Sequence, residues 1–582
     1  MKREEFFLMS YFKLVLGVSA FLIAPLGHSQ DLAQLGVDKG LKLSGSVNLS
    51  AIGYQAFGIP QRRDPFNWFV TGNLNVNLFG YNAPFSFSYS NANSSYSQPF
   101  NQFSFAPQYK WVKTYIGYNA MTFSRYTLAG HVFFGGGVEL TPGKWRVAAM
   151  YGRLRKAVPF NTSDSTQNDR ASFQRMGYGL KVGYEDSGNA IYASIFAAAD
   201  DVTSIPFVLP NTSLTPMQNV AVSVSGRKRF LKHFFVDGEY AVSALNKDSK
   251  AKSDQDSTVL RQSSNFIQGL LPQNATSRYY DAVNASIGYQ ANWYTIQLKY
   301  ERVAPEYQTL GAYFFNNDMQ NVTIAPTIRL LNGKLTMAAN VGLQNNNLDK
   351  TRASTTSRNV GALNANYTPN EKWNFASNYS NFSSFTNMRK YNDPFFQNKL
   401  DTLNFYQVSQ TLNANVIRNL GGKENPQSIM LNASFQNSSD QASYAGGGQK
   451  SDFISTNASY SYAIAPSNFT VAISANMYRT QSPGLQTTFW GPTVSLTKSF
   501  LEKTLRFSMS TTYNKTATSG ATQTSPIINN RLNINYAPKP KNGAGGHQTF
   551  SFGLNTLKKL EEIANQPAFT EMTGTINYSH TF

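Results

Sequence analysis

The chain has 582 residues, a net charge of +19 and no cysteine, which excludes thiolate metal sites, thiol catalysis and a disulfide framework. Only 14% of its residues are charged, 14% are aromatic, and the mean hydropathy is −0.35. That hydropathy excludes a bundle of membrane-spanning helices, and the aromatic content argues against a disordered chain.

Residues 1–29 are predicted to be a signal peptide. Basic residues precede a short apolar run from Leu14 to Ile23, and Ser29 is a small residue at a plausible cleavage position. The run is too short for a transmembrane helix, which needs about 20 apolar residues. Residues 30–40 then form a short periplasmic segment.

From residue 41 to residue 582 the sequence repeatedly alternates between apolar and polar residues. In one stretch Leu74, Val76 and Leu78 alternate with asparagines at 73, 75 and 77. Side chains alternate between the two faces of a strand, so each strand is predicted to have one apolar and one polar face. A soluble sandwich alternates too, but these strands run to about ten residues or more, long enough to cross a bilayer at a tilt. No segment of the sequence supplies a second apolar layer that could cover the apolar faces of these strands. Membrane lipid is therefore the simplest cover for them.

Turns and loops also alternate along the chain. Short turns with Pro, Gly or Asn are predicted at 141–144, 185–189, 331–334, 368–371 and 465–468. Longer polar loops are predicted at about 159–175, 201–218, 246–277, 345–358 and 385–407. This asymmetry is typical of outer-membrane barrels, whose short turns are periplasmic. We therefore predict an all-β fold: one large antiparallel transmembrane β-barrel of about 22 to 26 strands, without a separate plug domain.

The stretch from Tyr109 to Gly130 leaves two alternatives open, because its second half does not alternate cleanly. It forms either a strand or a segment folded into the lumen. In the second case the lumen residues would be Met121, Phe123, Arg125 and Tyr126. The glycines at 135–137 lie within a predicted strand and lack the tail of a phosphate-binding loop, so they favour close approach of another segment.

Two later segments have a distinct composition. Arg227, Lys228, Arg229 and Lys232 form a basic cluster in a predicted periplasmic turn, where they either contact a periplasmic partner or are simply solvated. The run from Leu557 to Asn565 has apolar residues at helical spacing and is predicted to be a helix in an extracellular loop.

The final residues, MTGTINYSHTF, resemble the assembly signal of outer-membrane proteins, which is a last strand with alternating apolar residues ending in Phe. Gly574, Ile576, Tyr578 and Phe582 carry this resemblance. The Asn-, Ser- and Tyr-rich strands also resemble Bacteroidota outer-membrane proteins. The glycosylation motif of that phylum is matched at 164–166, 256–258 and 401–403.

No motif points to catalysis, a metal or another cofactor. The histidines after residue 29 are not at metal-ligand spacing, and no nucleophile elbow occurs. The chain is thus predicted to be no enzyme, with no catalytic, cofactor-binding or metal-binding residues. Nucleic-acid motifs are absent as well, so the basic charge favours lipopolysaccharide and anionic solutes as partners rather than nucleic acid.

The prediction for function is a channel or translocation pore for hydrophilic solutes or cargo in the bacterial outer membrane. The alternative is a structural or assembly component whose lumen is closed by loops or by an envelope protein. Further predicted partners are outer-membrane lipid and, during assembly, the outer-membrane insertion machinery.

Overall fold

The computed structural model describes residues 42–78, 80–91, 99, 101–160, 171–209, 212–252, 271–350, 357–387, 404–440, 450–519, 526–539, 546–562 and 567–582. The predicted signal peptide, the segment 30–40 and the three candidate glycosylation motifs lie outside these ranges. Nothing below describes them.

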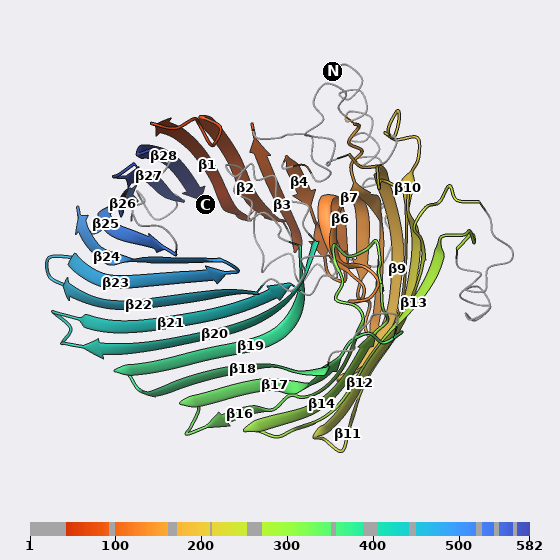
Figure 1. The fold of residues 1–582 in the computed structure, drawn as a ribbon. Coiled ribbons are helices and arrows are strands. Elements are labelled where there is room, and N and C mark those ends of the chain that lie inside the picture. Colours follow the sequence, from red (N-terminus) through yellow and green to blue (C-terminus); the bar gives the residue numbers. More distant parts are fainter. Residues whose placement is uncertain are drawn as a thin grey trace.

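The described chain is built almost entirely of long strands (Figure 1). Their bounds are β1 Lys42–Phe57, β2 Phe66–Leu78, β3 Tyr81–Ser90, β4 Gln102–Phe105, β5 Gln108–Tyr109, β6 Val112–Thr122, β7 Ala129–Leu140, β8 Trp145–Arg155, β9 Gln174–Asp186, β10 Asn189–Asp201, β11 Gln218–Phe230, β12 Phe234–Asn246, β13 Ser277–Gln290, β14 Tyr294–Val303, β15 Met319–Ile324, β16 Thr327–Leu330, β17 Leu335–Asn345, β18 Ser357–Asn370, β19 Trp373–Asn387, β20 Asn404–Leu420, β21 Gln427–Asp440, β22 Lys450–Ile464, β23 Phe469–Ser482, β24 Leu485–Phe500, β25 Leu505–Thr518, β26 Pro526–Tyr536, β27 His547–Lys559 and β28 Phe569–Thr581.

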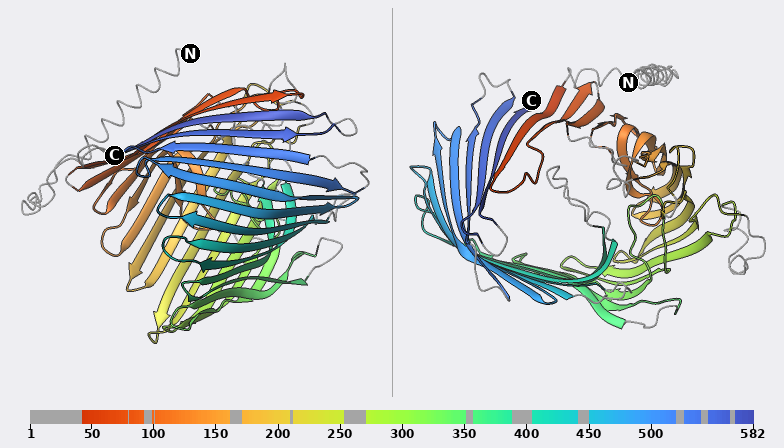
Figure 2. Two further views of the ribbon diagram at one scale, coloured as in Figure 1. Left: turned by 90° about the vertical axis from the view of Figure 1, so that its left-hand side faces the viewer. Right: turned by 45° about the horizontal axis from the view of Figure 1, so that its top comes forward.

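These strands form one closed antiparallel barrel. Each pairs with its neighbours in the sequence, and β1 pairs with β28 from Ser46↔Thr581 to Phe57↔Thr570. The ring therefore closes where the two ends of the described chain meet (Figure 2). Closure leaves no unpaired strand edge, which is what lipid requires because it cannot hydrogen-bond backbone groups.

Two of the strands are interrupted at a proline. β4 and β5 are separated by Ala106-Pro107, and β15 and β16 by Ala325-Pro326. Proline has no N–H to donate to the ladder, so a strand tends to break there. Both pieces of each pair face the same two neighbours, so the 28 segments correspond to 26 strands, which confirms the predicted barrel at the top of its expected range.

The predicted short turns are confirmed. The chain reverses between Leu140 and Trp145, between Asp186 and Asn189, and between Leu330 and Leu335. Left-handed φ angles of 49° at Ser187 and 85° at Gly188 make the second of these a tight hairpin turn.

The helix predicted from Leu557 to Asn565 is wrong over the part that the structure describes. Strand β27 continues through Lys559, which pairs with Phe569 of β28. The leucines have helical spacing, but the hydrogen bonds that this segment makes with β26 and β28 stabilise a strand instead. Residues 563–566 lie outside the described residues.

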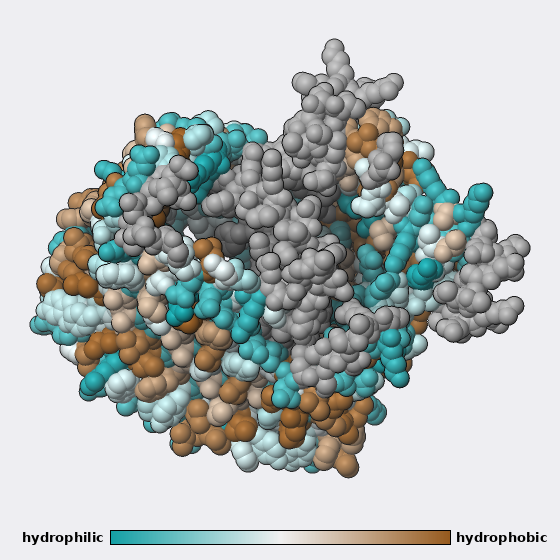
Figure 3. Space-filling model, viewed as in Figure 1, coloured by the Kyte–Doolittle hydropathy of each residue, from teal (hydrophilic) through white to brown (hydrophobic). Residues whose placement is uncertain are grey.

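The outer face of the barrel is apolar. Leu412, Leu431 and Ile473 are 42%, 50% and 53% exposed, and their side chains share the outer face of adjoining strands. Apolar side chains gather along the lower outer edge of the molecule (Figure 3). No helix in the described ranges is long and apolar enough to cross a membrane. A closed barrel with an apolar exterior is the architecture of a bacterial outer-membrane protein, and that is the location of this chain.

Candidate functional site: the lumen of the barrel

The inner surface of the barrel has two parts that differ in chemistry. We call the inner face of β6 to β14 the covered wall, because two segments of the chain pack on it. We call the inner face of β17 to β25 the open wall. Strand alternation and register assign the faces: Asn364, Asn378 and Asn413 lie opposite one another on the inside, and the apolar residues next to each lie outside.

The first segment on the covered wall is the β6–β7 tip, residues 123–128. Its ends are joined by a backbone bond in which Phe123 N–H donates to the Leu128 carbonyl at 2.9 Å. The side chains of Phe123, Tyr126 and Leu128 are all buried, and Leu128 is completely inaccessible. The chain thus leaves the barrel wall after β6, turns inward, and returns to the wall at β7.

The second segment is the β14–β15 loop, residues 304–318. Tyr307 and Leu310 are buried in the same apolar cluster as the tip, together with inward side chains of β6, β7, β8, β10, β12, β13 and β14. The Tyr307 hydroxyl donates to the Tyr126 carbonyl at 2.7 Å, and Ala129 N–H donates to the Gly311 carbonyl at 2.9 Å. The tip and the loop therefore support each other inside the lumen.

Polar side chains of the wall hold the two segments in place. Asn219 of β11 accepts a hydrogen bond from Leu310 N–H at 3.0 Å, and its own amide donates to the Ser243 hydroxyl at 2.7 Å. Ser243 in turn donates to the Gln308 carbonyl at 2.6 Å. Because Asn219 and Ser243 are fully enclosed, these bonds satisfy buried groups that would otherwise be costly.

Glycines make room for the tip on the covered wall. A Cβ atom at Gly137 would lie 2.6 Å from Met121 Sδ, and one at Gly179 would lie 2.6 Å from Phe123 Cε2. Met121 and Phe123 fill the space that these glycines leave. The predicted close approach to the glycine run is therefore found at Gly137.

Several charged side chains on the covered wall form ion pairs. Arg125 of the tip pairs with Glu301 at 2.9 Å, and Arg146 pairs with Glu185 at 2.9 Å. The Tyr126 hydroxyl also donates to Glu301 at 2.9 Å. Arg125, Arg146 and Glu185 border a polar recess of about 560 Å³ that also reaches the hairpin turn at Ser187.

Two phenols of the inward segments are strongly affected by burial. Burial raises the pKa of the Tyr307 hydroxyl well above its ordinary value. Burial, followed by the nearby Glu301 carboxylate, raises the pKa of Tyr126 as well. Both phenols therefore stay neutral at physiological pH and can donate the hydrogen bonds described above.

The open wall is amide-rich and largely uncharged, with Arg506 at the start of β25 as an exception. On the inner face of β19 to β24, no side chain that the structure describes is charged, and none on β19 to β23 is buried. Hydrogen bonds link neighbouring strands, from Asn476 to Thr493 at 2.9 Å and between Thr493 and Thr512 at 2.8 Å. Asn378 donates to Asn364 in the same way.

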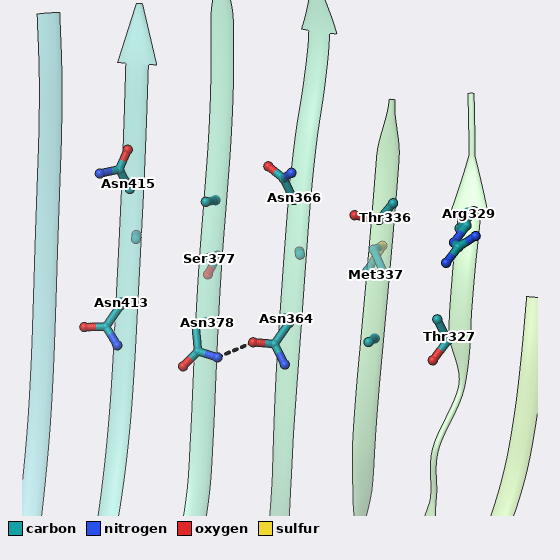
Figure 4. Close-up of a pocket in the computed structure, with 14 residues that line it drawn as sticks. Thr327, Arg329, Thr336, Met337, Asn364, Asn366, Ser377, Asn378, Asn413 and Asn415 are labelled. Carbon is teal, nitrogen blue, oxygen red and sulfur yellow. Dashed lines mark hydrogen bonds between the residues drawn. The ribbon is translucent and has the colours of Figure 1, made fainter. Parts of the chain in front are cut away.

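A shallow groove of about 530 Å³ crosses the start of the open wall (Figure 4). Its inward side chains come from β16 to β20. They are Thr327, Arg329, Thr336, Ala338, Asn364, Asn366, Ala376, Asn378, Asn413 and Asn415. The alanines leave space between the amides, while Ser377 and Met337 lie on the other side of the strands (Figure 4).

The structure separates the residues of the predicted basic turn. Arg227, Lys228 and Arg229 belong to β11, and only Lys232 lies in the turn that follows, so the predicted turn location is wrong for three of the four. The turn is tighter than expected because Leu231 and Lys232 take left-handed φ angles of 49° and 60°. Alternation then places Arg227 inside, 3.6 Å from Asp237, and Lys228 on the opposite face.

The residues of the predicted assembly signal lie at the seam of the barrel. Gly574, Ile576 and Tyr578 pair with Gly53, Ala51 and Leu49 of β1. The backbone of Phe582 makes two hydrogen bonds with Gly45, each 3.0 Å long.

Sequence analysis did not predict that the β14–β15 loop folds into the lumen. Its residues include Tyr307, Tyr313, Phe314 and Phe315 in a stretch without strand alternation. That combination of many aromatic residues and no period of two is the signal that could have revealed a segment folded inward. Within the described ranges, no group of three His, Asp or Glu residues could hold a metal ion.

Comparison with known proteins gives only a general likeness between barrels. No family model and no curated protein matches the chain. Among solved structures, OccAB2 of Acinetobacter baumannii is 10% identical, with a TM-score of 0.27 over 70% of this chain and 98% of that one. The P pilus usher translocation pore PapC is 12% identical, with a TM-score of 0.38 over 93% and 99%. An E. coli P pilus tip assembly intermediate, PapC-PapD-PapK-PapG, is 10% identical, with a TM-score of 0.43 over 95% and 62%.

Proposed function

We propose that the chain is an outer-membrane pore for hydrophilic solutes, and that solutes pass along the open wall. One observation carries this proposal: the inward side chains of β19 to β23 are uncharged, mostly polar and accessible, although they line the inside of a closed barrel. A purely structural role does not require an accessible polar surface inside the barrel. Hydrogen-bonding side chains on a pore wall replace part of the hydration of a passing solute.

The covered wall explains how so wide a barrel is narrowed. The β6–β7 tip and the β14–β15 loop fill the lumen beside β6 to β14 with an apolar cluster, so solutes are excluded from that side. The open wall remains as the hydrated path. Since the charges near the tip are largely paired and Arg329 is the cationic residue of the groove, we expect at most a mild preference for anions.

Conductance of the purified barrel in planar bilayers tests this function. We expect discrete conductance steps with weak ion selectivity. Silence under all conditions, together with a stoichiometric partner retained in mild detergent, would favour the alternative role as a structural or assembly component of an envelope complex. Basic residues near the β11–β12 turn, including Lys228 and Lys232, are the candidate contacts for such a partner.

We also propose that β28 carries the signal for the outer-membrane insertion machinery and that lipid and lipopolysaccharide surround the apolar exterior. The support is that β28 must pair with β1 to close the barrel. Phe582→Asp should therefore lower the amount of protein in the outer membrane and leave the conductance of each inserted barrel unchanged. A wild-type amount of heat-modifiable barrel on a fractionation blot would show that Phe582 is not part of such a signal.

A further inference from the structure

The groove on the open wall has a composition that narrows the class of ligand it can hold. Its inward side chains are amides, hydroxyls and alanines, with Arg329 as the charged residue at one side. Protein sites for Ca²⁺ and Mg²⁺ usually include carboxylate ligands, and none lines the groove. A lipid tail has no hydrogen-bonding groups to match the amides and hydroxyls that project into the groove.

The amides lie in rows that cross several strands. Register places Asn415 opposite Asn432, Asn432 opposite Asn457, and Asn457 opposite Asn476. Neighbouring strands are about 4.8 Å apart, so the row continues from the groove across four strands as a regular series of amide groups. Such a series suits an extended ligand with repeated polar groups better than a small compact one.

An amide group can donate and accept at the same time, and within the row Asn457 donates to Asn476, whose own amide donates to Thr493. Where Asn378 donates to Asn364, the pair still has donor and acceptor capacity left. The best complement is an uncharged ligand whose own groups both donate and accept, and hydroxyl groups do so.

An aromatic pair stands on the same wall. Phe453 and Tyr478 have ring centroids 6.5 Å apart and lie on the inner face of β22 and β23, toward the long-loop end. Tyr478 is 37% exposed and is two residues from Asn476 of the amide row. An aromatic face beside hydrogen-bonding groups suits a sugar ring, which has apolar C–H faces and a polar edge.

Resting on the proposed pore function, we propose that the open wall binds extended polyhydroxylated chains, of the oligosaccharide class, along the amide row from Asn366 and Asn415 toward Asn476 and Tyr478. Arg329 contributes donors at the groove end of this path. A peptide chain also donates and accepts, but its charged and apolar side chains have no counterparts on this wall, so we favour the saccharide.

Binding can be measured without relying on conductance. The probe is maltohexaose, observed by saturation-transfer NMR and calorimetry on the barrel in a detergent that has no sugar headgroup. Asn366→Leu with Asn415→Leu should weaken binding about tenfold, the expected loss from removing two hydrogen-bonding side chains. The matched control, Asn75→Leu with Asn77→Leu, removes two inward amides from β2 and should leave the affinity unchanged. Heat modifiability checks that both double variants are folded.

These outcomes distinguish a failure of the saccharide proposal from a failure of the proposed pore function. Maltohexaose binding to a barrel that never conducts would refute the pore function and leave the saccharide site standing. Conductance without maltohexaose binding, equal loss of affinity in both double variants, or equally tight binding of a neutral Gly/Ser peptide would each overturn the saccharide proposal. A polyethylene glycol of matched size, which has no internal hydroxyl groups, should not bind.

Discussion

The two walls of the lumen share the same strand geometry but differ in what lies against them. On the covered wall, inward glycines and alanines let the β6–β7 tip and the β14–β15 loop pack closely, and buried groups such as Asn219 bind these segments. On the open wall, inward asparagines and threonines bind mainly one another, and their side chains remain accessible. Small inward residues therefore accompany the inward segments on the covered wall, whereas rows of amides line a wall on which no described segment packs.

The strongest way to break this contrast is to release the β14–β15 loop. Tyr307→Ala with Leu310→Ala should cost about 2 to 5 kcal/mol per site in local packing, because both side chains are fully buried. The loop should then leave the covered wall, and the single-channel conductance should rise several-fold.

Leu412→Ala provides the control for that experiment, because it removes the same kind of side chain from the outer face, where Leu412 is 42% exposed. Its conductance should match the parent barrel. If the loop variant also conducts like the parent, the loop does not narrow the path.

A smaller change tests the glycine contacts. Gly179→Val should displace Phe123, since a Cβ there would lie 2.6 Å from that ring and 3.0 Å from the Ile195 carbonyl oxygen. We expect a loss of about 1 to 3 kcal/mol from overpacking, measured as a lower temperature of heat modification, together with noisier open-channel current.

Gly53→Val is the matched variant for this test, because a Cβ at Gly53 meets no atom within 4 Å. It should unfold at the parental temperature. Equal destabilisation by both substitutions would mean that loss of strand glycines, and not contact with the tip, causes the effect.

Charge substitution sharpens the contrast between the walls. Asn457→Asp adds a negative charge to an uncharged part of the open wall and should shift the reversal potential in a salt gradient toward cation selectivity. Glu185→Gln leaves Arg146 unpaired on the covered wall, away from the proposed solute path, and its shift should be smaller. The reverse ranking would place the solute path beside the covered wall.

The smallest expected effect is a pH dependence of the inward segments. The pKa values of Tyr126 and Tyr307 are raised by burial, so their contribution to packing is fully present below the ordinary phenol pKa of about 10 and is lost as the pH rises above it. Conductance and noise should be constant around neutrality and increase only in strongly alkaline solution. Tyr126→Phe with Tyr307→Phe should reduce that alkaline change, and an unaltered pH profile would show that other groups cause it.

Sequence reasoning predicted the barrel well because alternation is a local property. The run from Asn73 to Leu78 predicts a two-faced strand by itself, and the structure has β2 there. The same reasoning left the stretch from Tyr109 to Gly130 undecided, and the structure shows both alternatives in succession: strand β6, and then an inward tip. It mistook the end of β27 for a helix because leucine spacing is ambiguous over so few residues.

By itself, the sequence determined the fold class, the positions of the short turns and the chemistry of each strand face, since these depend on residues close together in the chain. Only the tertiary structure decided which connections fold inward. Tyr307 meets Tyr126, and Asn219 meets Leu310, across more than 90 residues of sequence in each case. Such contacts depend on barrel closure, which places β6, β11 and β14 around one lumen. A local sequence pattern cannot predict contacts between residues so far apart in the chain. The amide row has the same origin, because register between strands, and not spacing along one strand, aligns Asn415 with Asn432, Asn457 and Asn476.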